Sequence, residues 1–281
     1  MNRYFRLFRF GNGVMGVIGV IVGAFIASGF GIIDYWIGIF ISCAIVLIFM
    51  AGGNAINDYI DRDIDVVAHP DRPIPRGEIK PLMARNLGIS FLVLAVLIGI
   101  LAQALSMYMD FIFWDLLSVA IVVIASTLMI SYEMFLKQRG FIGNVTIAVL
   151  TGMIFLLGGA VCNNVIVVIP IALMAMLVNI GREVSKDIED LDSDEGRNTL
   201  PMRIGTRNAA VVASLSFLFG VALSIWPLLD GSMNHLYLLI LAADVMFIYA
   251  AFIVFRNAYE SQRVAKIAMA VALLAFVIGV I

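Results

Sequence analysis

The chain has 281 residues, of which 62% are hydrophobic and only 14% are charged, and its formal net charge is −2. Soluble globular proteins carry about 25% charged residues, so this composition excludes a soluble fold, and the small net charge excludes nucleic-acid binding by bulk electrostatics. The two cysteines and two histidines are too few and too scattered for a disulfide framework or a zinc site of the usual spacing.

Long apolar runs without charged residues predict membrane-spanning helices. A bilayer core about 30 Å thick requires about 20 helical residues, and the runs lack the apolar–polar alternation of a membrane β-barrel. We therefore predict an all-α polytopic membrane protein, a single domain over residues 1–281, with nine transmembrane helices in a bundle. The predicted spans are 14–33, 37–56, 87–105, 112–131, 143–162, 165–182, 208–228, 236–255 and 264–281.

Positive charges occur on alternate connections between these spans. With the N-terminus in the cytoplasm, all 18 Lys and Arg residues fall on the cytoplasmic side. Because cytoplasmic loops are enriched in Lys and Arg, the sequence predicts a cell-membrane protein with a cytoplasmic N-terminus and an external C-terminus. The two longest cytoplasmic segments, 57–86 and 183–207, are predicted to form a cap over the bundle.

Small residues recur at helical spacing in the first and fifth predicted spans. Such stripes let two helix backbones approach each other closely, so we predict tight packing of both spans against neighbouring helices. The residues are Gly16, Gly19 and Gly23 in the first span and Gly152, Gly158 and Gly159 in the fifth.

Two acidic motifs with the same spacing lie in the two long cytoplasmic segments. In each, three aspartates are separated by three and then four residues, and a polar residue lies four positions before the first aspartate. The chain therefore contains a degenerate internal repeat. The first motif comprises Asn54, Asp58, Asp61 and Asp65, and the second comprises Glu183, Asp187, Asp190 and Asp194.

The spacing within each motif predicts a metal site. Positions i, i+3 and i+7 share one face of a helix, and two carboxylates about 4 Å apart repel each other by on the order of 1–4 kcal/mol in wet surroundings. Mg²⁺ is a hard cation that binds carboxylates together with substrate phosphate oxygens. We predict that the six aspartates hold Mg²⁺ ions that clamp a diphosphate. The simpler alternative, two solvated acidic helix ends, leaves the shared spacing unexplained.

The paired motifs resemble the two signatures of the UbiA superfamily of membrane prenyltransferases, and the resemblance covers the whole chain. The stretches 136–144 and 182–187 look most like the archaeal ether-lipid branch of that superfamily. The matching segments are Asn57-Asp58-x-x-Asp61-x-x-x-Asp65, Asp187-x-x-Asp190-x-x-x-Asp194, Arg72-Pro-Ile-Pro-Arg76-Gly77 and Asn198-Thr-Leu-Pro201.

The resemblance implies Mg²⁺-dependent transfer of a geranylgeranyl group from geranylgeranyl diphosphate to geranylgeranylglyceryl phosphate, a lipid acceptor, with release of diphosphate. It implies that Asp58, Asp61, Asp187 and Asp190 are catalytic through the bound metal. It also implies that Lys137 neutralises the leaving group and that the ring of Tyr132 stabilises the allylic cation by cation–π attraction.

Eight further residues are candidates for substrate binding. Arg62 and Lys186 could reach the diphosphate, and Arg9, Asn12, Arg72 and Arg76 could bind the phosphate of the acceptor. Asn54 and Asn57 complete the set. Simpler roles stay open for these residues: membrane topology for the cations, neutralisation of adjacent aspartates for Arg62 and Lys186, and an interfacial position for Tyr132.

Three other functions are compatible with parts of the pattern. A prenyltransferase of the same superfamily could use an aromatic acceptor, but Tyr59 is the only aromatic residue in 57–86 and 183–207 has none. A cation transporter would place its acids near the membrane midplane, whereas these motifs follow predicted spans. A CDP-alcohol phosphatidyltransferase would carry a Gly and an Ala-Arg after its aspartates, which are absent here. Asp244, inside the eighth span, has no assigned role, and the oligomeric state is open.

Overall fold

The structure is a computed structural model that describes residues 2–109, 114–192, 198–229, 231 and 233–280. Within these residues the regular structure is entirely helical, without a β-strand, which confirms the predicted all-α class. The elements of the N-terminal half are α1 (Arg3–Leu7), α2 (Phe10–Ser28), the 3₁₀ segment η1 (Gly29–Tyr35), α3 (Trp36–Ile60), α4 (Arg62–Ala68), α5 (Pro81–Tyr108), α6 (Leu116–Ser131), the π-helical turn η2 (Tyr132–Leu136) and α7 (Phe141–Val161).

The C-terminal half is likewise built of long helices joined by short segments. Its elements are η3 (Ile166–Val168), α8 (Ile169–Glu189), η4 (Asp190–Asp192), α9 (Leu200–Ile204), α10 (Thr206–Ser224), α11 (Trp226–Leu229), η5 (His235–Leu239), α12 (Ile240–Ile253) and α13 (Ala258–Val280).

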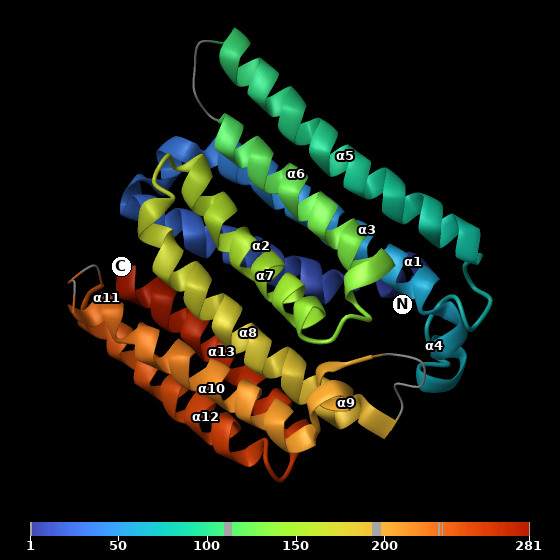
Figure 1. Ribbon diagram of the computed structural model, residues 1–281. Helices are drawn as coiled ribbons and strands as arrows, with labels where there is room; N and C mark the ends of the chain where they lie inside the picture. The colour runs from blue at the N-terminus through green and yellow to red at the C-terminus, as the bar shows by residue number, and fades with distance from the viewer. Residues whose placement is uncertain (1, 110–113, 193–197, 230, 232, 281) are drawn as a thin grey trace.

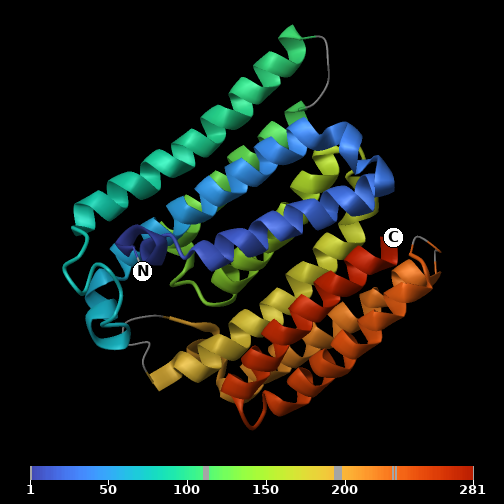
Figure 2. The same cartoon turned by 180° about the vertical axis from the view of Figure 1, so that it is seen from behind.

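Eight segments of the described residues are long and apolar enough to cross a membrane. The first of them, Phe10–Ile60, is 51 residues long, which is far more than the roughly 20 that one crossing needs. It contains α2 and α3, which fold back on each other at η1 (Figure 2). The predicted count of nine spans, which divides this segment into two, stays a prediction.

The sequence sets several helix starts. The side chain of Asp115 accepts a hydrogen bond of 2.7 Å from the backbone N–H of Ser118 and so caps α6. Pro81 is the first residue of α5. A backbone N–H at this position would have no partner within the helix, so proline, which has no N–H, is well tolerated there. Gly140 precedes α7 with φ of +62°, a left-handed conformation that glycine adopts without steric cost. This sharp turn leads from η2 directly into α7.

The helices form two groups, each packed around an apolar core of its own (Figure 1). One apolar core lies between α2, α3, α5, α6 and α7, and the other between α8, α10, α12 and α13, with contributions from α2 and α7. Both views place the N-terminus and the C-terminus at opposite ends of the bundle, and α1, α4 and α9 lie at the N-terminal end (Figures 1 and 2). That end carries both acidic motifs.

Close packing at the glycine stripes is confirmed. A Cβ on Gly158 of α7 would fall on the carbonyl oxygen of Val20 and lie 2.6 Å from the backbone nitrogen of Ala24, so α7 and α2 are in backbone contact there. Gly23 of α2 faces the backbone of Phe155 in return. These two glycines let α2 cross α7 at the centre of the molecule.

Gly158→Ala is therefore expected to destabilise the protein by about 1–3 kcal/mol, because the added methyl group has no space and the two backbones must separate. The melting temperature of the detergent-solubilised protein measures this loss. Gly11→Ala is the matched control in α2, since a Cβ on Gly11 meets nothing within 4 Å. Equal melting temperatures for the two variants would contradict the close contact.

Candidate active site

The first acidic motif begins at the C-terminal end of α3 and continues into α4. Asp58, Asp61 and Asp65 are all buried, with exposed fractions of 1%, 8% and 2%. The motif spans the junction of α3, which ends at Ile60, and α4, which begins at Arg62. The N–H of Asp61 donates to the Asn57 carbonyl, and the N–H of Asp65 donates to the Asp61 carbonyl. The three carboxylates are all buried, but the single helix expected for the motif is interrupted at Asp61.

Each of these three carboxylates is paired with a cation from a different part of the chain. The Arg9 guanidinium lies 2.6 Å from Asp58, the Lys137 ammonium 2.6 Å from Asp61, and the Arg72 guanidinium 2.6 Å from Asp65 and 3.5 Å from Asp58. Because a buried carboxylate is costly without a partner, these pairs balance the charge of the motif within the protein.

Arg9 has an unusual backbone conformation. Its φ of 47° and ψ of 57° are left-handed, which costs a non-glycine residue roughly 1–2 kcal/mol. The conformation lies at the junction of α1 and α2, and it accompanies hydrogen bonds from the guanidinium to Asn57 and Asp58. Backbone strain of this kind is concentrated at functional sites, and here it accompanies contact with the first motif.

The Tyr132–Leu136 turn is π-helical. The N–H of Lys137 donates to the carbonyl of Tyr132 at 2.9 Å, an i→i+5 bond that places these two residues one above the other although they are five positions apart. The same turn directs Glu133 inward, where it is 5% exposed and lies 3.4 Å from the Lys137 ammonium. The Asn57 amide donates to Glu133 at 3.1 Å.

The second motif lies at the C-terminal end of α8, which ends in the same way as α3. Asp190 and Asp61 end their helices with the same backbone angles, φ −81° and ψ 2°. The Asn144 amide donates to Asp187 at 2.8 Å, which ties α7 to this motif. Asp187 and Asp190 are half-buried, and Asp194 lies outside the described residues.

One cavity of about 620 Å³ joins the two motifs. Its polar end is lined by Asn54 and Asn57 of α3 and by Glu183 and Lys186 of α8. In the repeat, Asn54 corresponds to Glu183 and Asn57 to Lys186. Other polar side chains line the cavity too, Arg182, Gln262 and Lys266 among them, and the remaining wall is largely apolar and rich in methionine. Further lining residues are Arg9, Asn12, Tyr132, Glu133, Met15, Met50, Met129, Met174, Ile154, Phe155, Phe247 and Phe276.

Six of the fourteen predicted catalytic and substrate-binding residues therefore line this cavity, and the aspartates, Arg72 and Lys137 lie in or beside the two motifs. Two candidates have local partners instead. Arg62 donates to the carbonyl of Tyr59 and pairs with Asp63, and Arg76 pairs with Glu78 at 3.0 Å. Their predicted contact with substrate stays a prediction.

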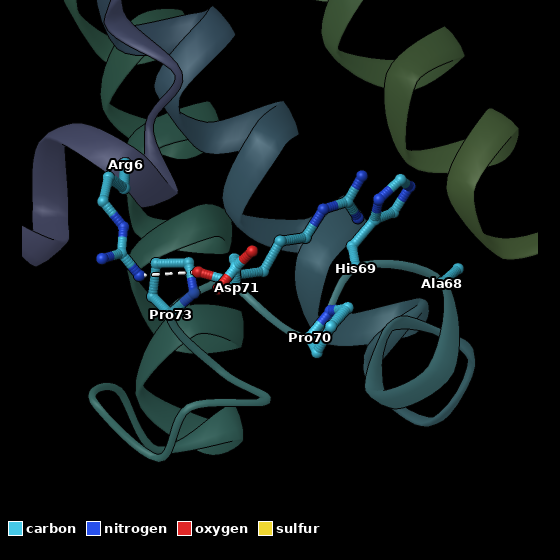
Figure 3. Close-up of a pocket in the computed structure, with 7 residues that line it drawn as sticks. Arg6, Ala68, His69, Pro70, Asp71 and Pro73 are labelled. Carbon is cyan, nitrogen blue, oxygen red and sulfur yellow. Dashed lines mark hydrogen bonds between the residues drawn. The ribbon is translucent and has the colours of Figure 1, made fainter.

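A smaller surface hollow of about 300 Å³ lies beside the first motif and is lined by Arg6 and residues 68–73. Figure 3 shows Arg6 reaching from α1 to the backbone of Asp71, whose carbonyl accepts a hydrogen bond of 2.8 Å from the guanidinium. Arg6 also pairs with Glu78 at 3.2 Å. These bonds attach α1 to the turn that carries Arg72 and so help to hold Arg72 against the aspartates.

The donor atoms at the motifs fit a magnesium ion. Oδ2 of Asp58 is buried and accepts no hydrogen bond from the described residues, so it has a free lone pair for a cation. Among the described residues, no three Asp, Glu, His or Cys side chains gather closely enough to hold one ion alone. Mg²⁺ in phosphoryl sites is typically bound by one or two carboxylates, with substrate oxygens and water as the other ligands.

Sequence reasoning gave no role to several residues of this site. Glu133, Arg182 and Asn144 are the clearest examples, and Arg182 contacts Glu183 directly. A signal existed for Glu133, because an acid at the end of an apolar span is a functional candidate. Asp244 lines the apolar part of the cavity and accepts a hydrogen bond of 2.8 Å from Ser224.

Two acidic motifs at the same end of a helical membrane bundle, whose helices both line one largely apolar cavity, are the arrangement of an intramembrane prenyltransferase. The chain belongs to the UbiA prenyltransferase family, whose model matches residues 16–277. This finding confirms the resemblance carried by the two motifs.

Full-length relatives point to one branch of the family. The digeranylgeranylglyceryl phosphate synthase of Thermococcus kodakarensis is 36% identical over 95% of this chain and 92% of its own length. That of Methanothermobacter thermautotrophicus is 34% identical over 99% of this chain and 96% of its own length.

Solved structures agree in fold. A structure described as that of digeranylgeranylglyceryl phosphate synthase in membranes is 31% identical, covers 99% of this chain and 97% of its own, and has a TM-score of 0.79. A UbiA homolog from Archaeoglobus fulgidus bound to GPP and Mg²⁺ is 15% identical over 99% of this chain and 98% of its own, with a TM-score of 0.66. At that identity the second likeness concerns the fold alone.

Proposed function

We propose that this protein transfers the geranylgeranyl group of geranylgeranyl diphosphate to the free hydroxyl of geranylgeranylglyceryl phosphate. The observation that carries this proposal is the single cavity lined by both motif helices, polar at the motif end and apolar beyond it. The names of the full-length relatives support the choice of substrates. The reaction breaks the allylic C–O bond, forms an ether bond and releases diphosphate.

The two ends of the cavity match the two parts of the donor. Asp58, Asp61, Asp187 and Asp190 would hold Mg²⁺, with Asp65 and Asp194 as further ligands, and the metal supplies positive charge to the leaving diphosphate. Lys137 adds a fixed cation beside Asp61. The methionines of the apolar wall fit a flexible prenyl chain, because unbranched thioether side chains adapt to irregular shapes.

The acceptor is the part of the proposal that a competition assay tests. With purified protein, geranylgeranyl diphosphate and Mg²⁺, geranylgeranylglyceryl phosphate is expected to be prenylated, and 4-hydroxybenzoate is not. A lipid hydroxyl is a weak nucleophile, so the enzyme gains several kcal/mol by holding it near the allylic carbon, and the arginines beside the first motif suit an anionic head group. Preferential prenylation of the aromatic acid would overturn the acceptor while leaving the prenyltransferase class intact.

The orientation in the membrane is also proposed. The bundle is a multi-pass membrane protein whose motif end would face the cytoplasm, since every Lys and Arg falls on that side in the predicted topology. Reporter domains fused after Arg139 and Asn257 are expected to be cytoplasmic, and one fused after Asn234 external. A cytoplasmic location of the reporter fused after Asn234 would contradict this topology.

A further inference from the structure

Glu133 is a buried carboxylate at the reaction end of the cavity that neither acidic motif includes. It lines the cavity beside Tyr132 and Asn57, and it is 5% exposed. Its partners are the Asn57 amide, which donates to both carboxylate oxygens at 3.1 and 3.4 Å, and the Lys137 ammonium at 3.4 Å. Lys137 lies closer to Asp61, at 2.6 Å. Glu133 therefore shares its ammonium partner with Asp61.

The other carboxylates that line the cavity are placed differently. Glu183 is paired with the guanidinium of Arg182. Asp244 lies in α12 and is bonded to Ser224 at the last residue of α10, about 27 Å along that helix from its start beside the motif end. Among the described lining residues, Glu133 is thus the carboxylate at the motif end that lacks a guanidinium partner.

Ether formation leaves one proton to be removed. As the allylic C–O bond breaks, the diphosphate keeps the electron pair, and a lone pair of the acceptor hydroxyl forms the new C–O bond. The hydroxyl proton must then pass to a base. We propose that the carboxylate of Glu133 accepts this proton, while Asn57 and Lys137 hold the carboxylate at the cavity wall. This inference rests on the proposed function.

A base and a positioning residue would affect different steps of the reaction, the capture of the allylic cation and the ionisation of the donor. If Glu133 is the base, Glu133→Gln leaves ionisation of the donor intact but slows capture by the hydroxyl. If Glu133 only positions Lys137, the substitution weakens ionisation as well, because Lys137 faces the leaving group. Ionisation is measured without capture, as movement of a labelled bridging oxygen of geranylgeranyl diphosphate into a non-bridging position.

The experiment compares wild type, Glu133→Gln, Glu133→Asp and the control Glu260→Gln, at a half-buried glutamate of α13 that does not line the cavity, in purified full-length protein with Mg²⁺. For Glu133→Gln we expect ether formation to fall by about 10²- to 10⁴-fold, the usual contribution of a general base, with oxygen exchange close to wild type. Glu133→Asp should recover part of the ether rate, because it restores a carboxylate. The melting temperature and the affinity for the donor report whether each variant is folded.

Three outcomes would overturn the inference. Ether formation and oxygen exchange that fall together would assign Glu133 a positioning role through Lys137. An unchanged rate of ether formation in Glu133→Gln would show that another group, such as the departing diphosphate, accepts the hydroxyl proton. A wild-type protein that forms no ether, yet exchanges the bridging oxygen, would instead refute the proposed acceptor and the inference together.

Discussion

Asparagine at Asp58 or at Asp187 is expected to lower the rate of prenyl transfer by about 10²-fold or more, the loss typical of removing one group that stabilises transition-state charge. Each substitution keeps the size of the side chain and removes one formal charge from a carboxylate that faces the site. At Asp58 the lost charge is buried and lies against Arg9 and Arg72. At Asp187 it lies beside Asn144.

The two aspartates have a matched control in the same segment. Asp63 lies two residues after Asp61, but its side chain is 84% exposed and pairs with Arg62 at 3.2 Å. Asp63→Asn is therefore expected to retain the wild-type rate. Transfer is measured in purified protein with labelled geranylgeranyl diphosphate, and melting temperatures report folding. A wild-type rate in folded Asp187→Asn would remove the second motif from the mechanism.

Removal of divalent metal offers an independent test of the same site. Treatment with EDTA is expected to abolish transfer in the wild type, and added Mg²⁺ should restore it, because the proposed leaving group depends on metal charge. Without metal, Asp58, Asp61 and Asp65 keep their partners Arg9, Lys137 and Arg72. The apoprotein should therefore stay folded, and activity that survives thorough chelation would contradict the metal-dependent mechanism.

Much of this architecture was predictable, because membrane helices and repeated motifs leave strong patterns. Apolar runs of about 20 residues fix helical spans with little dependence on tertiary contacts. The three-and-four spacing predicts a shared helix face, and Asp58, Asp61 and Asp65 are indeed buried together. The repeat was informative beyond the aspartates as well, because Asn54 and Glu183, which occupy equivalent positions in it, line the same cavity.

The pairing of charges was not predictable, because several arginines near each motif have equivalent chemistry. Arg62, Arg72 and Arg76 lie in the same segment, but their ion pairs differ. Arg72 pairs with Asp65 of the motif, whereas Arg62 pairs with Asp63 and Arg76 with Glu78. The difference depends on the course of the 69–80 turn, which Arg6 holds through Asp71 and Glu78. Spacing along the chain contains no information about such a contact between distant segments.

The π-helical turn was hidden for a similar reason. Helix periodicity assumes i→i+4 hydrogen bonds, and under that assumption Tyr132 and Lys137 point in different directions. The i→i+5 bond between them realigns the pair, and it also turns Glu133 toward Asn57. From sequence alone, Glu133 lies just beyond the predicted span 112–131 and has the appearance of an interfacial acid.

Methionine at Lys137 is expected to lower both stability and activity. The ammonium lies 2.6 Å from Asp61 and 3.4 Å from Glu133, and both carboxylates are buried. Methionine resembles the aliphatic part of lysine but leaves these charges unpaired, which costs about 3–5 kcal/mol for a buried pair. The transfer rate should fall as well, by about 10²-fold or more, because the leaving group loses a fixed cation.

Adding Glu133→Gln to Lys137→Met separates these two effects. The double variant has one buried charge fewer than Lys137→Met, so it is expected to melt at a higher temperature than Lys137→Met, and the double-mutant cycle should show a coupling of about 0.5–3 kcal/mol. The transfer rate of the double variant should stay low, because it lacks both the Lys137 ammonium and the Glu133 carboxylate. Lys80→Met, at an exposed lysine before α5, is the control and should change neither property. Strictly additive losses of stability in the cycle would contradict the contact between Lys137 and Glu133.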